Sequence, residues 1–402
     1  MTNFLCDIMR EIVILSDGRV TTCCHDSLGV NSYADIYKES FESVRKEFIK
    51  ARSDLTTNPK LFPKCVECYR ESSKMKSGDK IVRFPPNLPT LDVASYLKDS
   101  ERLSWSFVVE PTAHCNLKCV GCVQSKKKLR KHRKGMILDL DYLRSWIGAH
   151  VVNVDLIRFY NYGEPFLHEG AIEFCTAIKE SSPATLITVA TNGMALRSHI
   201  DRVRLIRSGI ENLVFSIHGG SQKTCERYMT KAFHFDRVME ILTDLVRIRG
   251  ELGRESPELI WKYILFKWND SDEEIGKAKE LAETIGIDTV LFQLTTSPSP
   301  SKRFTANSDD WKILTKDMVF YGDIDSAFWK VKASQPFLQG LHTMHNDKET
   351  ATDSCVVVGE DLTLNIPSVE YNGSKYKAIL KHYPNPADPS GLYWKLHSYV
   401  LK

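Results

Sequence analysis

The hydrophobic pattern between about residues 104 and 300 alternates between short apolar runs and longer segments with apolar residues every three or four positions. The short runs predict strands at 105–110, 156–161, 186–191, 213–218, 260–266 and 290–294. The segments between them predict helices at 140–149, 172–180, 197–207, 235–249 and 273–285. This alternation predicts an α/β fold in which helices cover a parallel sheet that is open or partly closed.

The flanking segments have different patterns. Residues 1–75 contain five of the 11 cysteines and a strand-like run at 11–15. Residues 76–103 contain three closely spaced prolines and are predicted to be a linker. Residues 301–402 show no regular pattern, and we predict a C-terminal extension that is a candidate cover for the mouth of the sheet.

Composition narrows the classes of protein. A content of 42% hydrophobic and 26% charged residues is typical of a globular protein, and a net charge of +3 is too small to indicate a nucleic-acid partner. The sequence shows neither a membrane-spanning run nor a signal peptide, so we expect a cytoplasmic protein with no membrane partner. In that reducing compartment, closely spaced cysteines favour metal binding over disulfides.

The strongest chemical signal directly follows the first predicted strand. Cys115, Cys119 and Cys122 are spaced so that three thiolates can bind three corners of one iron–sulfur cube. Three ligands leave one iron open to a further molecule. The alternative is a structural zinc loop whose fourth ligand lies elsewhere in the chain.

Further motifs follow the next three predicted strands. The second is followed by a Gly-Glu-Pro turn, the third ends in Thr-Asn-Gly, and the fourth carries a serine and a histidine. Each motif is weak alone, but all fall at the carboxyl ends of strands, where parallel α/β folds place their chemistry. The residues are Gly163, Glu164, Pro165, Thr191, Asn192, Ser216 and His218.

Together these features resemble the radical S-adenosylmethionine (SAM) superfamily over residues 104–300. The resemblance implies a partial (βα)6 TIM-like barrel, a [4Fe–4S] cluster on the three cysteines, bound SAM, and an electron donor such as flavodoxin or ferredoxin. It also implies that Glu164 holds the amino group of SAM, that Gly121 contacts adenine through its backbone, and that polar side chains after the third strand contact the ribose or the methionine carboxylate. The family cleaves SAM to a 5′-deoxyadenosyl radical that removes a hydrogen atom from the substrate.

A second cysteine group lies in the N-terminal block. An Asp-Gly turn at 17–18 predicts a β-hairpin that brings Cys6 and Cys23 together, and Cys65 and Cys68 can complete the site. This pattern resembles the SPASM or shortened twitch domains, which implies one auxiliary [4Fe–4S] cluster. The block departs from SPASM domains in two ways. It precedes the predicted barrel instead of following it, and it lacks the later cysteines of a full two-cluster SPASM domain. Four thiolates on zinc are the alternative, and Cys24 competes with Cys23 as a ligand.

The remaining candidates lie outside these motifs. Seven of the nine residues at 126–134 are Lys or Arg, and we expect Lys127, Arg130 and Arg133 to bind an anionic substrate, with a solvated face as the alternative. Cys355 is a candidate hydrogen-atom donor. Cys175 and Cys225 are predicted to lie in the core.

The sequence therefore predicts a radical SAM enzyme that acts on a small polar substrate, anionic or of the sugar or nucleotide type, by epimerisation, dehydrogenation or group exchange. One alternative is a SPASM-type maturase of a ribosomally made peptide. The other is a metal-cluster protein that binds RNA through residues 126–134 without catalysis.

Overall fold

The computed structural model describes residues 11–66, 105–126, 132–133, 135–321, 323–331, 368–371, 374–385 and 388–401. The predicted sites Cys6, Cys68, Lys127, Arg130 and Cys355 lie outside the described residues, as does most of the predicted linker at 76–103. None of the described helices is long and apolar enough to cross a lipid bilayer.

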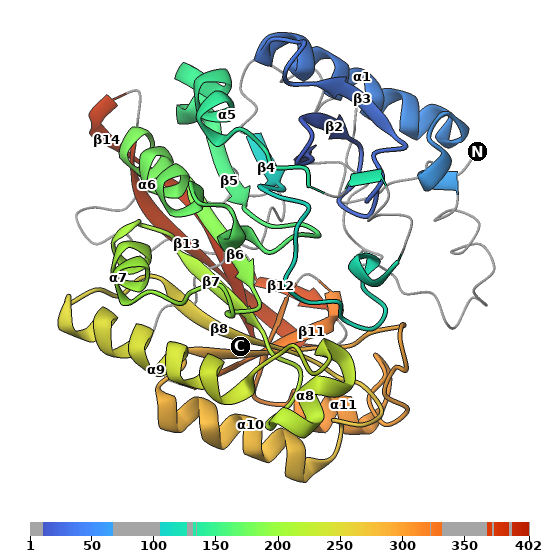
Figure 1. The fold of residues 1–402 in the computed structure, drawn as a ribbon, viewed down its shortest axis with the longest axis vertical. Coiled ribbons are helices and arrows are strands. Elements are labelled where there is room, and N and C mark those ends of the chain that lie inside the picture. Colours follow the sequence, from blue (N-terminus) through green and yellow to red (C-terminus); the bar gives the residue numbers. More distant parts are fainter. Residues whose placement is uncertain are drawn as a thin grey trace.

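One large sheet organises the molecule (Figure 1), with strands in the order β10-β11-β9-β8-β7-β6-β5-β4-β1-β2-β3. Its central strands β4 to β9 are parallel neighbours. The strands are β1 (Glu11–Ile14), β2 (Arg19–Thr21), β3 (Ser32–Asp35), β4 (Trp105–Val109), β5 (Val154–Arg158), β6 (Leu186–Thr191), β7 (Asn212–Ser216), β8 (Glu258–Ile264), β9 (Thr289–Gln293), β10 (Val319–Tyr321) and β11 (Asp323–Lys330). This is a mixed α/β fold with a large, mainly parallel sheet, consistent with the predicted TIM-like barrel.

Helices connect the parallel strands. They are α5 (Leu140–Ile147), α6 (Ala171–Ser181), α7 (His199–Arg207), α8 (Gln222–Met229), α9 (Phe235–Glu251) and α10 (Asp272–Ile285), with α1 (Phe41–Thr57) before β4 and α11 (Asp309–Leu314) after β9. Six of these eight helices start at a serine or aspartate that accepts a hydrogen bond from a first-turn amide, as at Ser198 before α7 and Ser271 before α10. These caps fix where the loops after the strands end.

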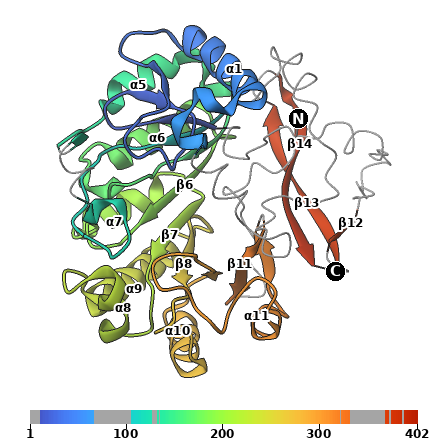
Figure 2. The same cartoon turned by 90° about the vertical axis from the view of Figure 1, so that its right-hand side faces the viewer.

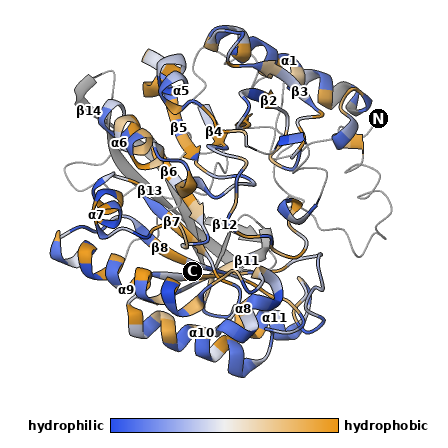
Figure 3. Cartoon of the chain, in the orientation of Figure 1, coloured by the Kyte–Doolittle hydropathy of each residue, from blue (hydrophilic) through white to orange (hydrophobic). Residues whose placement is uncertain are grey.

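The two faces of the sheet have different surroundings. One face packs against the helices in the main core, which includes Ile187, Phe215 and Trp261. Because side chains alternate along a strand, the other residues point to the opposite side, which we call the second face. It carries a small apolar cluster of Val214, Ile260, Leu291 and Phe328 together with polar side chains. Figure 3 shows apolar strands inside and hydrophilic outer surfaces on α9 and α10.

The N-terminal block joins this sheet directly. The predicted hairpin is confirmed: β1 pairs antiparallel with β2 across the 17–18 turn, where Gly18 has a φ of +82°. On its other edge β1 pairs in parallel with β4, so β1 to β3 continue the main sheet. Helix α1, which the sequence prediction missed, packs Phe41, Val44 and Phe48 into the main core.

The C-terminal part forms a separate antiparallel sheet of β12 (Ser368–Tyr371), β13 (Ser374–Asn385) and β14 (Asp388–Leu401). Figure 2 shows this sheet on the opposite side of the main sheet from α8, α9 and α10. This three-stranded sheet therefore lies on the side of the second face, whereas β10 and β11 of the C-terminal part belong to the main sheet.

Candidate active site

The cysteine loop begins directly after β4. Cys115, Cys119 and Cys122 are all partly buried, and the backbone amide of Leu117 donates to Cys115 Sγ over 3.4 Å. Burial is the main cause that raises the thiol pKa of all three cysteines, to about 12 for Cys115 and Cys119. Neighbouring thiolates would raise those two pKa values further.

Three thiols in one loop are a suitable donor set for an iron–sulfur cluster. Positive iron would stabilise the thiolates that burial disfavours, and binding would release their protons. Across the described residues, no three histidine, cysteine or acidic side chains are placed to hold a metal ion together. The assignment of these cysteines to one cluster therefore stays a prediction.

Backbone contacts tie this loop to neighbouring strand ends. Gln124 Nε2 donates to the carbonyl oxygens of Ala113 at 2.9 Å and Tyr162 at 2.6 Å. The amide of Val120 donates to the carbonyl of Tyr228, at the end of α8, over 2.7 Å. The loop is therefore held between the segment that follows β5 and the helix that follows β7.

Glu164 lies beside the cysteine loop and is almost fully buried, with 2% of its surface exposed. Its amide donates to the carbonyl of His114, its Oε1 accepts from the Thr191 hydroxyl at 2.5 Å, and its Oε2 accepts from the Asn192 amide at 2.8 Å. Burial raises the carboxyl pKa to about 7, and these hydrogen bonds oppose the rise. A buried carboxylate held in this way is suited to binding a cation.

Asn192 connects the carboxylate to the cysteine loop. Its Nδ2 donates to Asn116 Oδ1 at 2.8 Å and lies 3.8 Å from Cys115 Sγ, while its own backbone amide binds Glu164. The structure thus brings together three predicted motifs that lie far apart in the sequence: the cysteine loop, the Gly-Glu-Pro turn and the Thr-Asn-Gly segment.

Two glycines permit this close packing. A Cβ on Gly163 would lie 1.8 Å from the carbonyl oxygen of Thr112, so only glycine fits there. Gly121, between two of the cysteines, has a φ of +85°, and a Cβ there would lie 2.6 Å from Pro298 Cδ. Pro165 is buried and starts a 3-10 turn, Pro165–Leu167, whose cap is the side chain of Glu164.

Ser216 and His218 lie at the end of the fourth parallel strand. His218 is buried, its Nδ1 accepts from the amide of Ile264 at 3.3 Å, and burial lowers its pKa to about 3, so the ring is neutral at pH 7. Its ring lies edge-on to Tyr228 and Phe266, which stack on each other with centroids 4.8 Å apart. The sequence prediction missed this aromatic group, because its members come from separate segments: the loop after β7, helix α8 and the loop after β8.

The second cysteine group is only partly described. Asn31 Nδ2 lies 3.1 Å from Thr22 Oγ1 and 3.5 Å from Cys65 Sγ, so the segment before Cys23 and the segment around Cys65 approach each other. Burial is the main cause that raises the pKa of Tyr162, and thiolates at Cys24, Cys23 and Cys122 would add to the rise. Cys23, Cys24 and Cys122 thus all lie near enough to Tyr162 to influence its hydroxyl.

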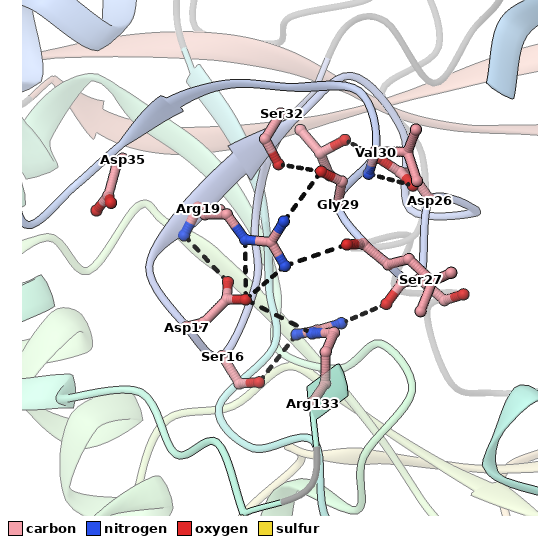
Figure 4. Close-up of polar contacts among 12 residues, drawn as sticks. Ser16, Asp17, Arg19, Asp26, Ser27, Gly29, Val30, Ser32, Asp35 and Arg133 are labelled. Atoms are coloured by element: carbon pink, nitrogen blue, oxygen red, sulfur yellow. Dashed lines mark hydrogen bonds and ion pairs between the residues drawn. The ribbon is translucent and has the colours of Figure 1, made fainter. Parts of the chain in front are cut away.

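Arg133 does not fit the prediction that it binds substrate. Its side chain is fully buried, and it donates to Ser27 O at 2.8 Å, to Ser16 Oγ at 2.9 Å and to Glu110 Oε1. Figure 4 shows the guanidinium between the hairpin turn and the segment at Ser27, with Asp17 beside it. The guanidinium is held inside the protein and is therefore not available at an open mouth.

The two isolated cysteines lie where the sequence predicted them. Cys175 and Cys225 are fully buried in the main core, and Cys225 Sγ donates to the carbonyl of Gly219 at 3.4 Å.

Comparison with protein families agrees with the geometry. Residues 109–251, which run from the end of β4 to the end of α9, match the model of the Radical SAM superfamily. This match supports membership of the radical SAM superfamily. The superfamily implies a [4Fe–4S] cluster and SAM, and the chain supplies partly buried thiols, a buried carboxylate and a glycine cradle to hold them.

Several solved structures resemble the chain weakly. They are TYW1 with a lysine–pyruvate adduct bound (14% identity, TM-score 0.40, 66% of this chain and 95% of that one), methylornithine synthase PylB (12%, 0.33, 56% and 68%), and coproporphyrinogen III oxidase HemN from Escherichia coli (13%, 0.33, 56% and 51%). The chain thus spans about half of HemN. No curated protein is a significant match.

Proposed function

We propose that this protein is a radical SAM enzyme that cleaves SAM reductively and removes a hydrogen atom from a small polar substrate. The observation that carries the proposal is the position of Asn192, whose side chain reaches the Cys115 sulfur while its amide binds Glu164. This single residue links the predicted cluster loop to the predicted site for the amino group of SAM.

The proposed roles follow from the contacts. The bound cluster and SAM would supply the one-electron chemistry that generates the 5′-deoxyadenosyl radical. Glu164 would bind the ammonium of SAM in a charge-assisted pair, with Thr191 and Asn192 holding its two oxygens. The backbone at Gly163 would allow close approach of the ligand, and the neutral His218 with Tyr228 and Phe266 would exclude water from the adjacent wall.

The substrate remains part of the proposal. We propose a small polar molecule, anionic or of the sugar or nucleotide type, that undergoes epimerisation, dehydrogenation or group exchange. The basic residues Lys127 and Arg130 stay candidates for binding it, without Arg133.

An auxiliary cluster belongs to the same proposal. The Asn31 side chain contacts Cys65 and also Thr22, the neighbour of Cys23 in the chain, which supports a shared site that Cys6 and Cys68 would complete. We propose that this site binds one [4Fe–4S] cluster beside the β5 loop.

The decisive experiment measures 5′-deoxyadenosine by mass spectrometry after the anaerobically reconstituted protein is reduced in the presence of SAM. Wild-type protein should form it without added substrate, and Cys119→Ala should not. Cys175→Ala is a matched control, because this thiol lies in the core away from the loop and its variant should remain active. If reconstituted wild-type protein binds iron but never cleaves SAM, the proposal is wrong.

A further inference from the structure

Lys262 occupies an unusual position on the second face of the sheet. It lies in β8, between Trp261 and Tyr263, which point into the main core. Alternation along the strand places Lys262 on the same face as Ile260, in the small apolar cluster. The register pairs Lys262 with Ser216 at the end of β7 on one side and with Leu291 on the other.

The lysine stands near the carboxyl ends of the strands, above an apolar floor. Val214 pairs with Ile260 one step toward the strand starts, and Leu291 and Phe328 complete the cluster. The aliphatic stem of Lys262 can therefore lie along this floor while its ammonium points toward the strand ends. The cysteine loop and Glu164 follow other strands of the same sheet at that edge.

The ammonium has no partner among the described residues: no hydrogen bond or ion pair of its side chain is found there. Burial lowers the pKa of Lys262, and the Lys262 charge adds to the burial that lowers the pKa of His218. Lys262 is half-buried, and an unpaired cation that has lost part of its water is destabilising unless an anion is supplied.

The acidic groups of the second face are already engaged. Glu11 forms an ion pair with Arg158 across β1 and β5. Glu258 accepts from the Thr289 hydroxyl at 2.5 Å. Glu110, at the end of β4, is bound by Arg133. Among the described residues, these contacts leave no acidic side chain to pair with Lys262.

We propose that Lys262 binds an anionic group, a carboxylate or a phosphate, on the substrate of this enzyme. The inference rests on the proposed function, because the anion is taken to belong to a substrate of the radical SAM reaction. Binding of the anion at Lys262 does not itself depend on SAM cleavage. Ser216, which pairs with Lys262 in the register, is placed to add a hydroxyl contact. The charge-assisted contact would orient the substrate from the floor of the site while its reacting end faces the cluster loop.

The test measures the melting temperature of SAM-loaded, reconstituted protein with inorganic phosphate or, separately, acetate, against chloride at equal ionic strength. At least one anion should raise the melting temperature of wild-type protein. Lys262→Met should weaken the binding of that anion by about 10- to 100-fold, which is the loss of affinity expected for a charge-assisted hydrogen bond. Phosphate and acetate as separate probes distinguish the two kinds of anion.

Lys267→Met is the matched control, because Lys267 is exposed, lies five residues further on and carries the same charge. It should bind the anion like wild-type protein. Without anion, Lys262→Met should melt no lower than wild-type protein, since it replaces an unpaired, half-buried charge by an apolar side chain of similar length. Lys262→Gln provides the same measurement if the methionine variant does not fold.

Three results would overturn the proposal. The first is that neither anion stabilises wild-type protein at millimolar concentration, and the second is that the stabilisation survives in the Lys262 variants. The third is that Lys262→Met weakens the binding of SAM. The last result would assign the ammonium to the methionine carboxylate of SAM. A failure of the proposed function looks different, because wild-type protein would then bind the anion but form no 5′-deoxyadenosine.

Discussion

Glu164 shows how a single buried residue can be prepared for a charged ligand. Its carboxyl group is held by the Thr191 hydroxyl and the Asn192 amide, but no cation lies among its described contacts. Desolvation therefore outweighs the hydrogen bonds and raises its pKa to about 7. A bound cation would offset the free-energy cost of ionising this buried carboxyl group.

This balance predicts a pH-dependent affinity for SAM. Below about pH 7 the carboxyl is neutral in the ligand-free protein, and binding an ammonium must first remove its proton, so SAM affinity should fall as the pH is lowered. Glu164→Gln should weaken the binding of SAM by about 10- to 100-fold at pH 8 and should abolish the pH dependence of the affinity. Isothermal titration calorimetry from pH 6 to about pH 8.5 measures both effects.

The iron content serves as the control for that experiment. Glu164→Gln should keep the iron of wild-type protein, because the residue is not a predicted ligand. A variant with normal SAM affinity would show that the amino group of SAM binds elsewhere.

Gly163 provides a steric test at the same scale. Gly163→Ala places a methyl group 1.8 Å from the Thr112 carbonyl oxygen, so the loop must move. We expect a lower melting temperature and at least tenfold weaker SAM binding. Gly276→Ala is the control: this position lies inside α10 with open space around it, so alanine should stabilise by about 0.5–1 kcal/mol. Equal melting temperatures for the two variants would contradict the packing.

At the scale of elements, Glu110 and Arg133 join three segments. Glu110 ends β4 and accepts from the Ser16 hydroxyl at 2.9 Å and the Tyr162 amide at 3.4 Å, and Arg133 pairs with it. The hairpin, the β5 loop and the segment beyond the cysteine loop therefore meet at one buried ion pair. Arg133 therefore stabilises the fold, although it belongs to the basic run at 126–134 that the sequence predicts to bind substrate or to be solvated.

Breaking this pair should destabilise the protein strongly. Arg133→Met leaves Glu110 buried without its partner, which should lower the free energy of unfolding by about 3–5 kcal/mol. The double variant Arg133→Met/Glu110→Gln should regain part of that loss, since it leaves no unpaired charge. Urea unfolding of both single variants and the double variant measures the coupling, and strictly additive losses would show that the two side chains act independently.

The predicted elements show where sequence patterns succeed. All six predicted parallel strands are present as β4 to β9, and the five predicted helices match α5, α6, α7, α9 and α10. The predicted strand at 156–161 is shifted, because β5 runs from Val154 to Arg158 and the chain turns before the Glu164 loop. Helix α1 was missed although Phe41, Val44 and Phe48 follow a helical spacing after the Ser40 cap.

At the scale of the whole molecule, the fold brings members of both cysteine groups toward one residue. Cys23 and Cys24 of the N-terminal group and Cys122 of the cysteine loop are separated by the residues of α1 and the predicted linker, but all three influence Tyr162. The parallel pairing of β1 with β4 is the cause, since it continues the N-terminal block into the same sheet.

The number of clusters can be counted. Anaerobically reconstituted protein should contain about eight irons, roughly four per cluster. Replacing Cys115, Cys119 and Cys122 together by alanine should leave about four, and replacing Cys23 and Cys65 should also leave about four. Iron analysis and electron paramagnetic resonance measure this. A wild-type protein that saturates at one cluster, or a triple variant without iron, would rule out the auxiliary cluster.

The sequence by itself determined the local features: the alternation of strands and helices, the hairpin turn, the cysteine spacing and the motifs at the strand ends. These depend on neighbours within a few residues, through side-chain periodicity and backbone preference. Only the tertiary structure decided that Asn192 links Cys115 to Glu164, that Arg133 is buried, and that Lys262 has no partner among the residues that the structure describes. Such facts depend on strand order and register, which pair residues far apart in the chain and which no local pattern encodes.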